Sequence, residues 1–201
     1  MKALRNDGRR RAAGLAAALV LCAPQAHAHL VETGLGPVYD GIAHFALTPE
    51  DLIPALAVAV LAGLRGSDRA RRVIVALPLA WLLGALFGAL ASPPPFASLA
   101  WVPLVVLGGL VAADLRLPGV ATTAIAAAVG LFLGLANGVA MVQAGAGVRG
   151  VVGITGAVFV VTTLFAASVV AWQQGWQRIA WRAAGSWVAA SGLLRLGWSL
   201  R

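Results

Sequence analysis

The sequence predicts an all-α membrane protein, a bundle of about six transmembrane helices that follows a cleaved signal peptide. Of its 201 residues, 60% are hydrophobic and only 11% are charged, whereas a soluble domain has about 25% charged residues. The apolar residues form runs, several of them close to the ~20 residues that a helix needs to cross a bilayer. Most basic residues lie ahead of or between these runs. A water-soluble fold is excluded, and the lipid bilayer is the expected surrounding.

The N-terminus has the three parts of a secretory signal. Residues 1–11 are basic, residues 12–23 form an apolar core too short for a comfortable span, and residues 24–28 supply the small-x-small pattern that signal peptidase reads. We expect cleavage after Ala28, and cleavage after Ala26 is the alternative. The signal peptide is therefore predicted to be residues 1–28.

The predicted cleavage site has chemical consequences for the mature chain. Cleavage after Ala28 would make His29 the first residue, and an N-terminal histidine offers a metal ion both its amine and its ring nitrogen. The alternative interpretation is that His27 and His29 only flank the cleavage site. The single cysteine, Cys22, lies in the leader, so the mature protein has no thiol chemistry.

Six apolar runs follow a polar segment at residues 29–51, and together they predict a transmembrane bundle over residues 52–201. The first run is short, and we expect its helix to start near Phe45. Thr48 as N-cap and Pro49 as first helical residue also indicate a helix start, in which Glu50 and Asp51 would be ordinary first-turn acids. The runs are 52–64, 73–91, 97–113, 120–142, 148–172 and 179–200.

The arginines predict the orientation. The basic connections 65–72, 114–116 and 173–178 alternate with 92–95 and 143–149, which carry almost no charge. The positive-inside rule places the basic connections in the cytoplasm. The mature N-terminus and, after six spans, the C-terminus then lie in the periplasm, as in a multi-pass protein of the bacterial inner membrane. The net charge of +8 is thus a topology signal, and no nucleic-acid partner is expected.

Small and charged residues inside the runs predict how the spans are arranged. Gly130, Gly134 and Gly138 recur at four-residue spacing, which makes a small-residue stripe for close approach of another helix. Arg182 and Arg195 interrupt the last run, and we expect their long side chains to reach opposite membrane faces.

The polar segment also contains the best candidates for a metal site. Asp40 and His44 are four residues apart, so a helix would place both on one face. Carboxylate and imidazole donors suit divalent nickel, cobalt, zinc or copper, and His29 and Glu32 would extend the site at the periplasmic mouth. The alternative is that Asp40 caps a helix or orders a turn while His44 joins an interfacial hydrogen-bond network.

Asn137 is the notable polar residue of the fourth run. An amide at that depth needs a partner inside the bundle. It could line a transport path or hold two helices together. The runs contain no Ser/His/Asp set, no phosphate-binding glycine loop and no pair of catalytic carboxylates. We therefore expect no enzyme, and no cofactor beyond a divalent metal ion is implied.

Several segments of the mature chain resemble the HupE/UreJ family of membrane proteins, in its branch with a signal peptide. The likeness lies in residues 29–44, 47–52, 61–66, 184–194 and 196–198, so it covers essentially the whole mature chain. The resemblance implies an accessory protein of hydrogenase or urease maturation, with nickel uptake as its activity and maturation proteins as partners.

The chain departs from the better-studied branch of this family, which looks like it has adjacent aspartate and histidine plus further histidines in later spans. Here the pair is Asp40 and His44, and no histidine follows His44. Two hypotheses result. In the first, the protein transports a divalent metal, with His29, Asp40 and His44 at the entry and Asn137 on the path. In the second, it is a non-transporting accessory or anchor protein whose periplasmic segment binds a metal or a partner.

Overall fold

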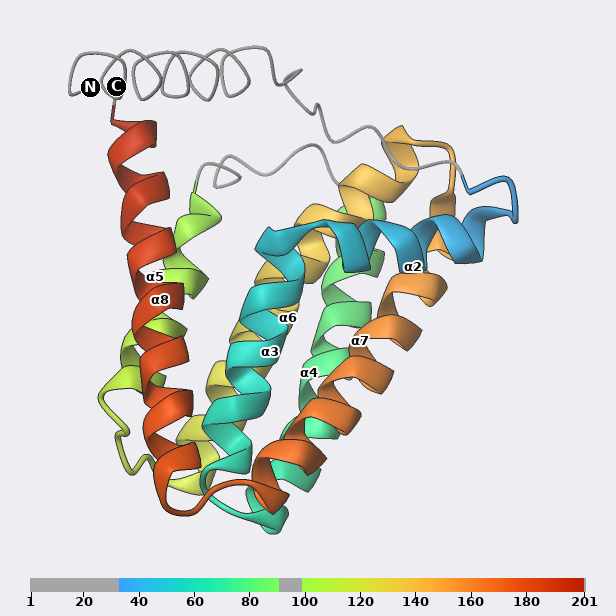
Figure 1. Cartoon of the computed structure of the whole chain (residues 1–201). Helices are drawn as coiled ribbons and strands as arrows, with labels where there is room; N and C mark the ends of the chain where they lie inside the picture. The colour runs from blue at the N-terminus through green and yellow to red at the C-terminus, as the bar shows by residue number, and fades with distance from the viewer. Residues whose placement is uncertain (1–32, 91–98, 201) are drawn as a thin grey trace, which may run out of the picture.

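The computed structural model describes residues 33–90 and 99–200, and within these residues it is entirely helical (Figure 1), which confirms the predicted fold class. The predicted signal peptide, His29 and Glu32 lie outside the described residues. The described helices are α2 (Pro37–Leu47), α3 (Pro49–Gly63), α4 (Ser67–Leu90), α5 (Trp101–Ala112), α6 (Gly119–Gln143), α7 (Gly147–Ala171) and α8 (Trp176–Ser199).

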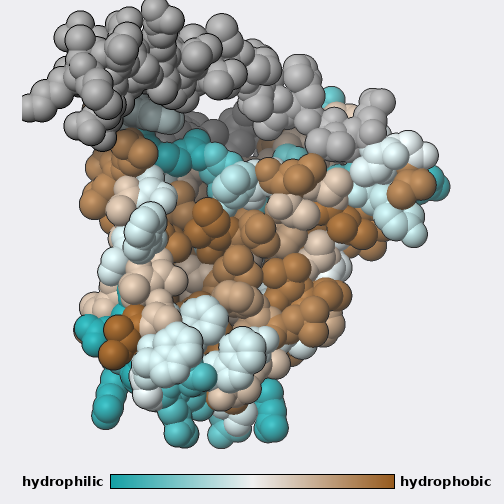
Figure 2. Space-filling model, viewed as in Figure 1, coloured by the Kyte–Doolittle hydropathy of each residue, from teal (hydrophilic) through white to brown (hydrophobic). Residues whose placement is uncertain are grey.

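Each of the six predicted apolar runs forms a helix, but the helices differ in length and polarity. By length and composition, α4, α6 and α7 can each cross a membrane, and the α2–α3 pair makes a fourth if it is one broken span. Helix α5 has only 12 residues, and α8 carries three arginines among its 24 residues. The count of six spans therefore stays a prediction. Hydrophobic residues cover the middle of the face in Figure 2, and hydrophilic ones gather at the end where α3 joins α4.

A sharp bend separates α2 from α3. The two helices meet at 73°, and the break falls at Thr48, whose backbone is extended because it precedes Pro49. Helix α3 begins at Pro49, as the Thr48-Pro49 pattern predicts, although the Thr48 side chain makes no capping bond. The predicted start near Phe45 is therefore wrong, because Phe45 lies in α2. Helix α2 runs across one end of the bundle, here called the α2 end (Figure 1).

The α4–α6 seam is closed by glycines from both helices. A Cβ at Gly130, Gly134 or Gly138 would run into the backbone of α4, and a Cβ at Gly84 or Gly88 would run into the backbone of α6. The two backbones therefore touch along several turns, as in other membrane helix pairs with small interface residues. The predicted glycine stripe is confirmed, and it fixes the position of α6 against α4.

An ionic cluster joins the chain connections at the end opposite α2. The Asp114 carboxylate accepts hydrogen bonds from Arg65 at 2.6 Å and from Arg178 at 2.7 and 3.0 Å. The Arg65 side chain is only 6% exposed and also donates to the Leu115 carbonyl at 2.8 Å. Three connections, whose charges in the sequence predict only the topology, are thus tied together. The basic connections lie at one end of the bundle, as their alternation predicts.

We expect this cluster to make stability depend on acidity. Partial burial alone would raise the pKa of the Asp114 carboxyl, but the hydrogen bonds and charges of Arg178 and Arg65 outweigh it and hold that pKa below its ordinary value. The stabilisation is therefore complete above the ordinary carboxyl pKa of about 4 and is lost as pH falls through the lower pKa of the folded state. Asp114→Asn should lower Tm at pH 7 by roughly 2 to 4 °C.

Thermal unfolding of the detergent-solubilised protein between pH 7 and pH 3 tests this expectation. The wild type should lose more stability on acidification than Asp114→Asn, because the variant has no carboxyl at this position to protonate. Parallel pH profiles for the two proteins would show that Asp114 is not responsible.

Candidate metal-binding site

Polar side chains from three helices meet at the bend between α2 and α3. His44 Nε2 lies 3.8 Å from Asp51 Oδ2, and Asn137 Nδ2 donates a hydrogen bond to Asp51 Oδ1 at 3.0 Å. His44 belongs to the last turn of α2, Asp51 to the first turn of α3 and Asn137 to α6. We call these three residues the corner site.

The bend is what brings His44 and Asp51 together. Residues seven apart on a straight α-helix are separated by roughly 10 Å along its axis, but the break at Thr48 folds α2 back over the start of α3. Phe45, beside His44, is fully buried and packs edge-on against Trp81 with ring centroids 5.8 Å apart. This contact anchors the end of α2 that carries the histidine.

Asn137 is fixed from the other side. It precedes Gly138 in the α4–α6 seam, and its Nδ2 also donates to the Leu133 carbonyl of its own helix at 2.9 Å. Its side-chain oxygen Oδ1 is buried, and the His44 ring lies close enough to interact with this side chain. The predicted need of Asn137 for a partner inside the bundle is confirmed, and the partner is Asp51.

The corner site is suited to a cation. Asp51 is 5% exposed, and no lysine or arginine of the described chain pairs with it. A buried carboxylate without a basic partner is costly inside a membrane protein. The buried Asn137 Oδ1, the Asp51 carboxylate and the His44 imidazole together offer the oxygen and nitrogen donors that divalent transition metals accept.

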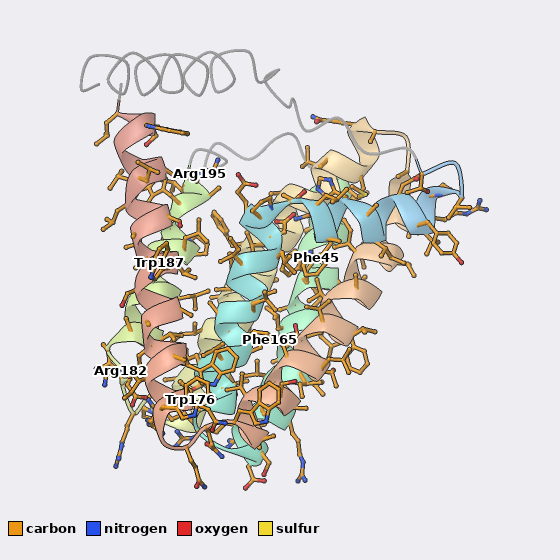
Figure 3. The ribbon with its side chains drawn as sticks, in the orientation of Figure 1. Phe45, Phe165, Trp176, Arg182, Trp187 and Arg195 are labelled. Carbon is orange, nitrogen blue, oxygen red and sulfur yellow. The ribbon has the colours of Figure 1, made fainter. Side chains whose placement is uncertain are left out.

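A pocket of about 190 Å³ opens at the corner site. Thr48 and Glu50 add polar groups to its wall, and apolar residues of α6 form the opposite side. Such a volume admits an ion together with several water molecules. The Glu50 carboxylate is also engaged outside the pocket, because it forms an ion pair with Arg195, which lies on α8 (Figure 3).

Asp40 lies elsewhere. Its carboxylate accepts hydrogen bonds from both the backbone nitrogen and the hydroxyl of Thr33, each at 2.7 Å, and it lines a different pocket, beside Gly34 and Gly145. The structure thus gives Asp40 the local ordering role of the alternative interpretation. It does not show Asp40 and His44 in one site, and the predicted metal set of His29, Glu32, Asp40 and His44 stays untested.

Comparison with known proteins shows the family. The family model for the HupE / UreJ protein matches residues 17–195. The chain belongs to the HupE/UreJ family. No curated protein and no solved structure shows significant similarity to the chain. Membership of HupE/UreJ supports a role in metal handling for hydrogenase or urease maturation, and the matched region contains the whole corner site.

One residue of the corner site, Asp51, could not be identified as a site residue from its position in the sequence. Asp51 follows a proline in the first turn of a helix, and such acids usually interact with the helix dipole. The signal that could have identified Asp51 is the proline break between it and His44, since two polar residues on either side of a sharp bend can meet. In the described parts of this family member, no three His, Cys, Asp or Glu side chains gather closely enough to hold a metal. A metal ion at the corner site would need the Asn137 amide as a further donor.

Proposed function

We propose that this HupE/UreJ protein transports a divalent metal ion, with Ni²⁺ as the favoured cargo, and that the corner site binds the ion where it enters the bundle. The buried Asp51 carboxylate, with His44 and Asn137 around it in a pocket of about 190 Å³, is the observation that supports this function. Ionisable residues inside membrane bundles commonly mark ion paths. No chemical step on the cargo is proposed.

The small number of donors is consistent with passage. One imidazole, one carboxylate and one amide leave several coordination positions of the ion to water. A conducting site must bind the ion well enough to admit it and weakly enough to release it. A site completed by water exchanges its ion more readily than a closed site of four protein ligands.

We further propose that the corner site faces the periplasm and that the bundle lies in the inner membrane. Arg65 and Arg116 belong to connections at the opposite end of the bundle, and Arg178 lies there in the first turn of α8. Under the positive-inside rule that end is cytoplasmic. An ion bound at the corner site would therefore be on its way inward.

The second candidate function is that of a non-transporting accessory protein, which holds a metal or a maturation protein at the α2 end and uses the bundle as an anchor. It is supported by the scarcity of polar groups deeper in the bundle. Beyond the corner site, the buried polar side chains of residues 33–90 and 99–200 are Thr122 and Thr162. Thr122 already donates to the Pro118 carbonyl at 3.2 Å.

Nickel uptake into proteoliposomes separates the two functions. We expect the wild type to take up Ni²⁺ and His44→Ala to take it up at least about tenfold more slowly, since even outer-shell partners of a metal ligand matter by that factor. Asp40→Asn, on the same helix but bonded to Thr33, should remain near the wild-type rate. Wild-type uptake no faster than that of empty liposomes would reject transport and leave the accessory function.

A further inference from the structure

The Glu50–Arg195 ion pair joins α3 to α8 at the edge of the corner pocket. Glu50 lines the pocket, whereas Arg195 approaches from the neighbouring helix (Figure 3). The two side chains are 35% and 43% exposed, so the protein encloses neither of them. A partly exposed ion pair of this kind contributes little to stability and can open without unfolding the protein.

The pair also determines the charge at the pocket. With Asp51 ionised and His44 neutral, Asp51 and Glu50 supply two negative charges and Arg195 supplies one positive charge, which leaves one net negative charge. If Arg195 moves away, two negative charges remain, and these match one divalent cation. The position of Arg195 therefore decides whether Glu50 is available to an ion in the pocket.

We propose that Arg195 is a specificity-determining residue that competes with the metal for Glu50. A divalent ion that enters the corner site displaces Arg195, and the released Glu50 carboxylate turns toward His44 and Asp51 and becomes an additional ligand. A monovalent ion brings no more charge than Arg195 already supplies and does not replace the charge-assisted hydrogen bonding of the guanidinium. This inference rests on the proposed function, because it requires a metal at the corner site.

The packing of α8 permits this displacement. Helix α8 packs closely on α5, where a Cβ at Gly185 or Gly192 would contact α5 atoms at 2.7 Å. Between α8 and α3 lies a cavity of about 310 Å³. Its lining includes Ile53 and Leu56 from α3 and Trp187 from α8. Arg195 therefore reaches Glu50 from a helix that is not packed tightly against α3.

Calorimetric titration of Ni²⁺ into the full chain in detergent tests the competition. Arg195→Gln should raise the affinity about threefold to fivefold, the factor expected from removing a partly exposed ion pair. Glu50→Gln should lower the affinity, because the ligand is lost together with the pair. The two variants break the same contact, so opposite signs distinguish competition from a structural role, in which both would change the affinity in the same direction.

Matched variants complete the design. Arg182→Gln removes the same charge from α8 at the other end, where the side chain donates to the Ala112 carbonyl, and should leave the affinity unchanged. If Arg195→Gln is not recovered folded, Arg195→Lys weakens the same contact by removing the planar guanidinium. Competition then requires Arg195→Lys to bind Ni²⁺ more tightly than the wild type does.

The outcomes separate this inference from the proposed function. If His44→Ala lowers the affinity but Arg195→Gln leaves it unchanged or lowers it, competition is overturned and the corner site stands. If His44→Ala leaves the affinity unchanged, His44 is not a ligand and the proposed function fails as well.

Discussion

Replacing Gly134 and Gly138 together with alanine is expected to destabilise the bundle more than any other small substitution. Each new Cβ would overlap a carbonyl oxygen of α4, that of Trp81 or that of Ala85. Backbone atoms inside a helix cannot rotate away as a flexible side chain can, so the two helices must separate. One methyl group forced into a well-packed interface lowers the free energy of unfolding by roughly 1 to 3 kcal/mol. The double variant should lose more than either single variant.

The measurement is unfolding of the purified protein in mixed detergent micelles, followed by tryptophan fluorescence. Gly156→Ala is the matched control, since it lies in α7 and a Cβ there meets nothing within 4 Å. Alanine is the better helix former by about 1 kcal/mol in water, so this control should be neutral or slightly stabilising. A loss in the control as large as that in the double variant would show that helix packing is not the cause.

The second large effect is expected from Asp51→Asn, which should reduce nickel uptake to the rate of empty liposomes. Asparagine has nearly the same size as aspartate, and its side-chain oxygen can still accept the hydrogen bond from Asn137 Nδ2. The substitution therefore removes the negative charge and little else. Stability should be unchanged or higher, because a buried carboxylate that no lysine or arginine neutralises opposes folding.

Asp68→Asn is the control for the loss of one carboxylate. Asp68 lies on the surface in the first turn of α4, where its side chain is 84% exposed and its carboxylate lies 3.7 Å from Arg71. Its replacement should leave uptake at the wild-type rate. If Asp51→Asn takes up Ni²⁺ at the wild-type rate, the Asp51 carboxylate has no role in transport, and the proposed path loses its main support.

Much of the fold could be predicted from the sequence because membrane helices are governed by local rules. A helix in lipid needs a long apolar run, so the runs and the connections between them identify the helices. The stripe at Gly130, Gly134 and Gly138 also predicts close packing, since four-residue spacing fixes which side chains share a face. The partner helix, α4, could not be predicted, because many spans offer an apolar face.

The candidate site was harder to predict because its contacts are not local. Spacing places Asp40 and His44 on one helix face, but Thr33 provides the nearer partner for Asp40. Asn137 meets Asp51 across 86 positions of the chain, and no periodicity encodes such a contact. The bend at Thr48 depends on a proline, which is visible in the sequence, but the 73° angle depends on how α2 packs against α7.

That bend has a thermodynamic consequence. His44 and Asp51 stand on opposite arms of it, so their separation is a function of one interhelix angle. Any ion held by both arms favours the angles that suit its radius, and by reciprocity anything that stiffens the joint at that angle strengthens the ion's binding. The packing of α2 on α7, where Gly41 meets the backbone of Gly150, would then influence ion binding without touching the ion.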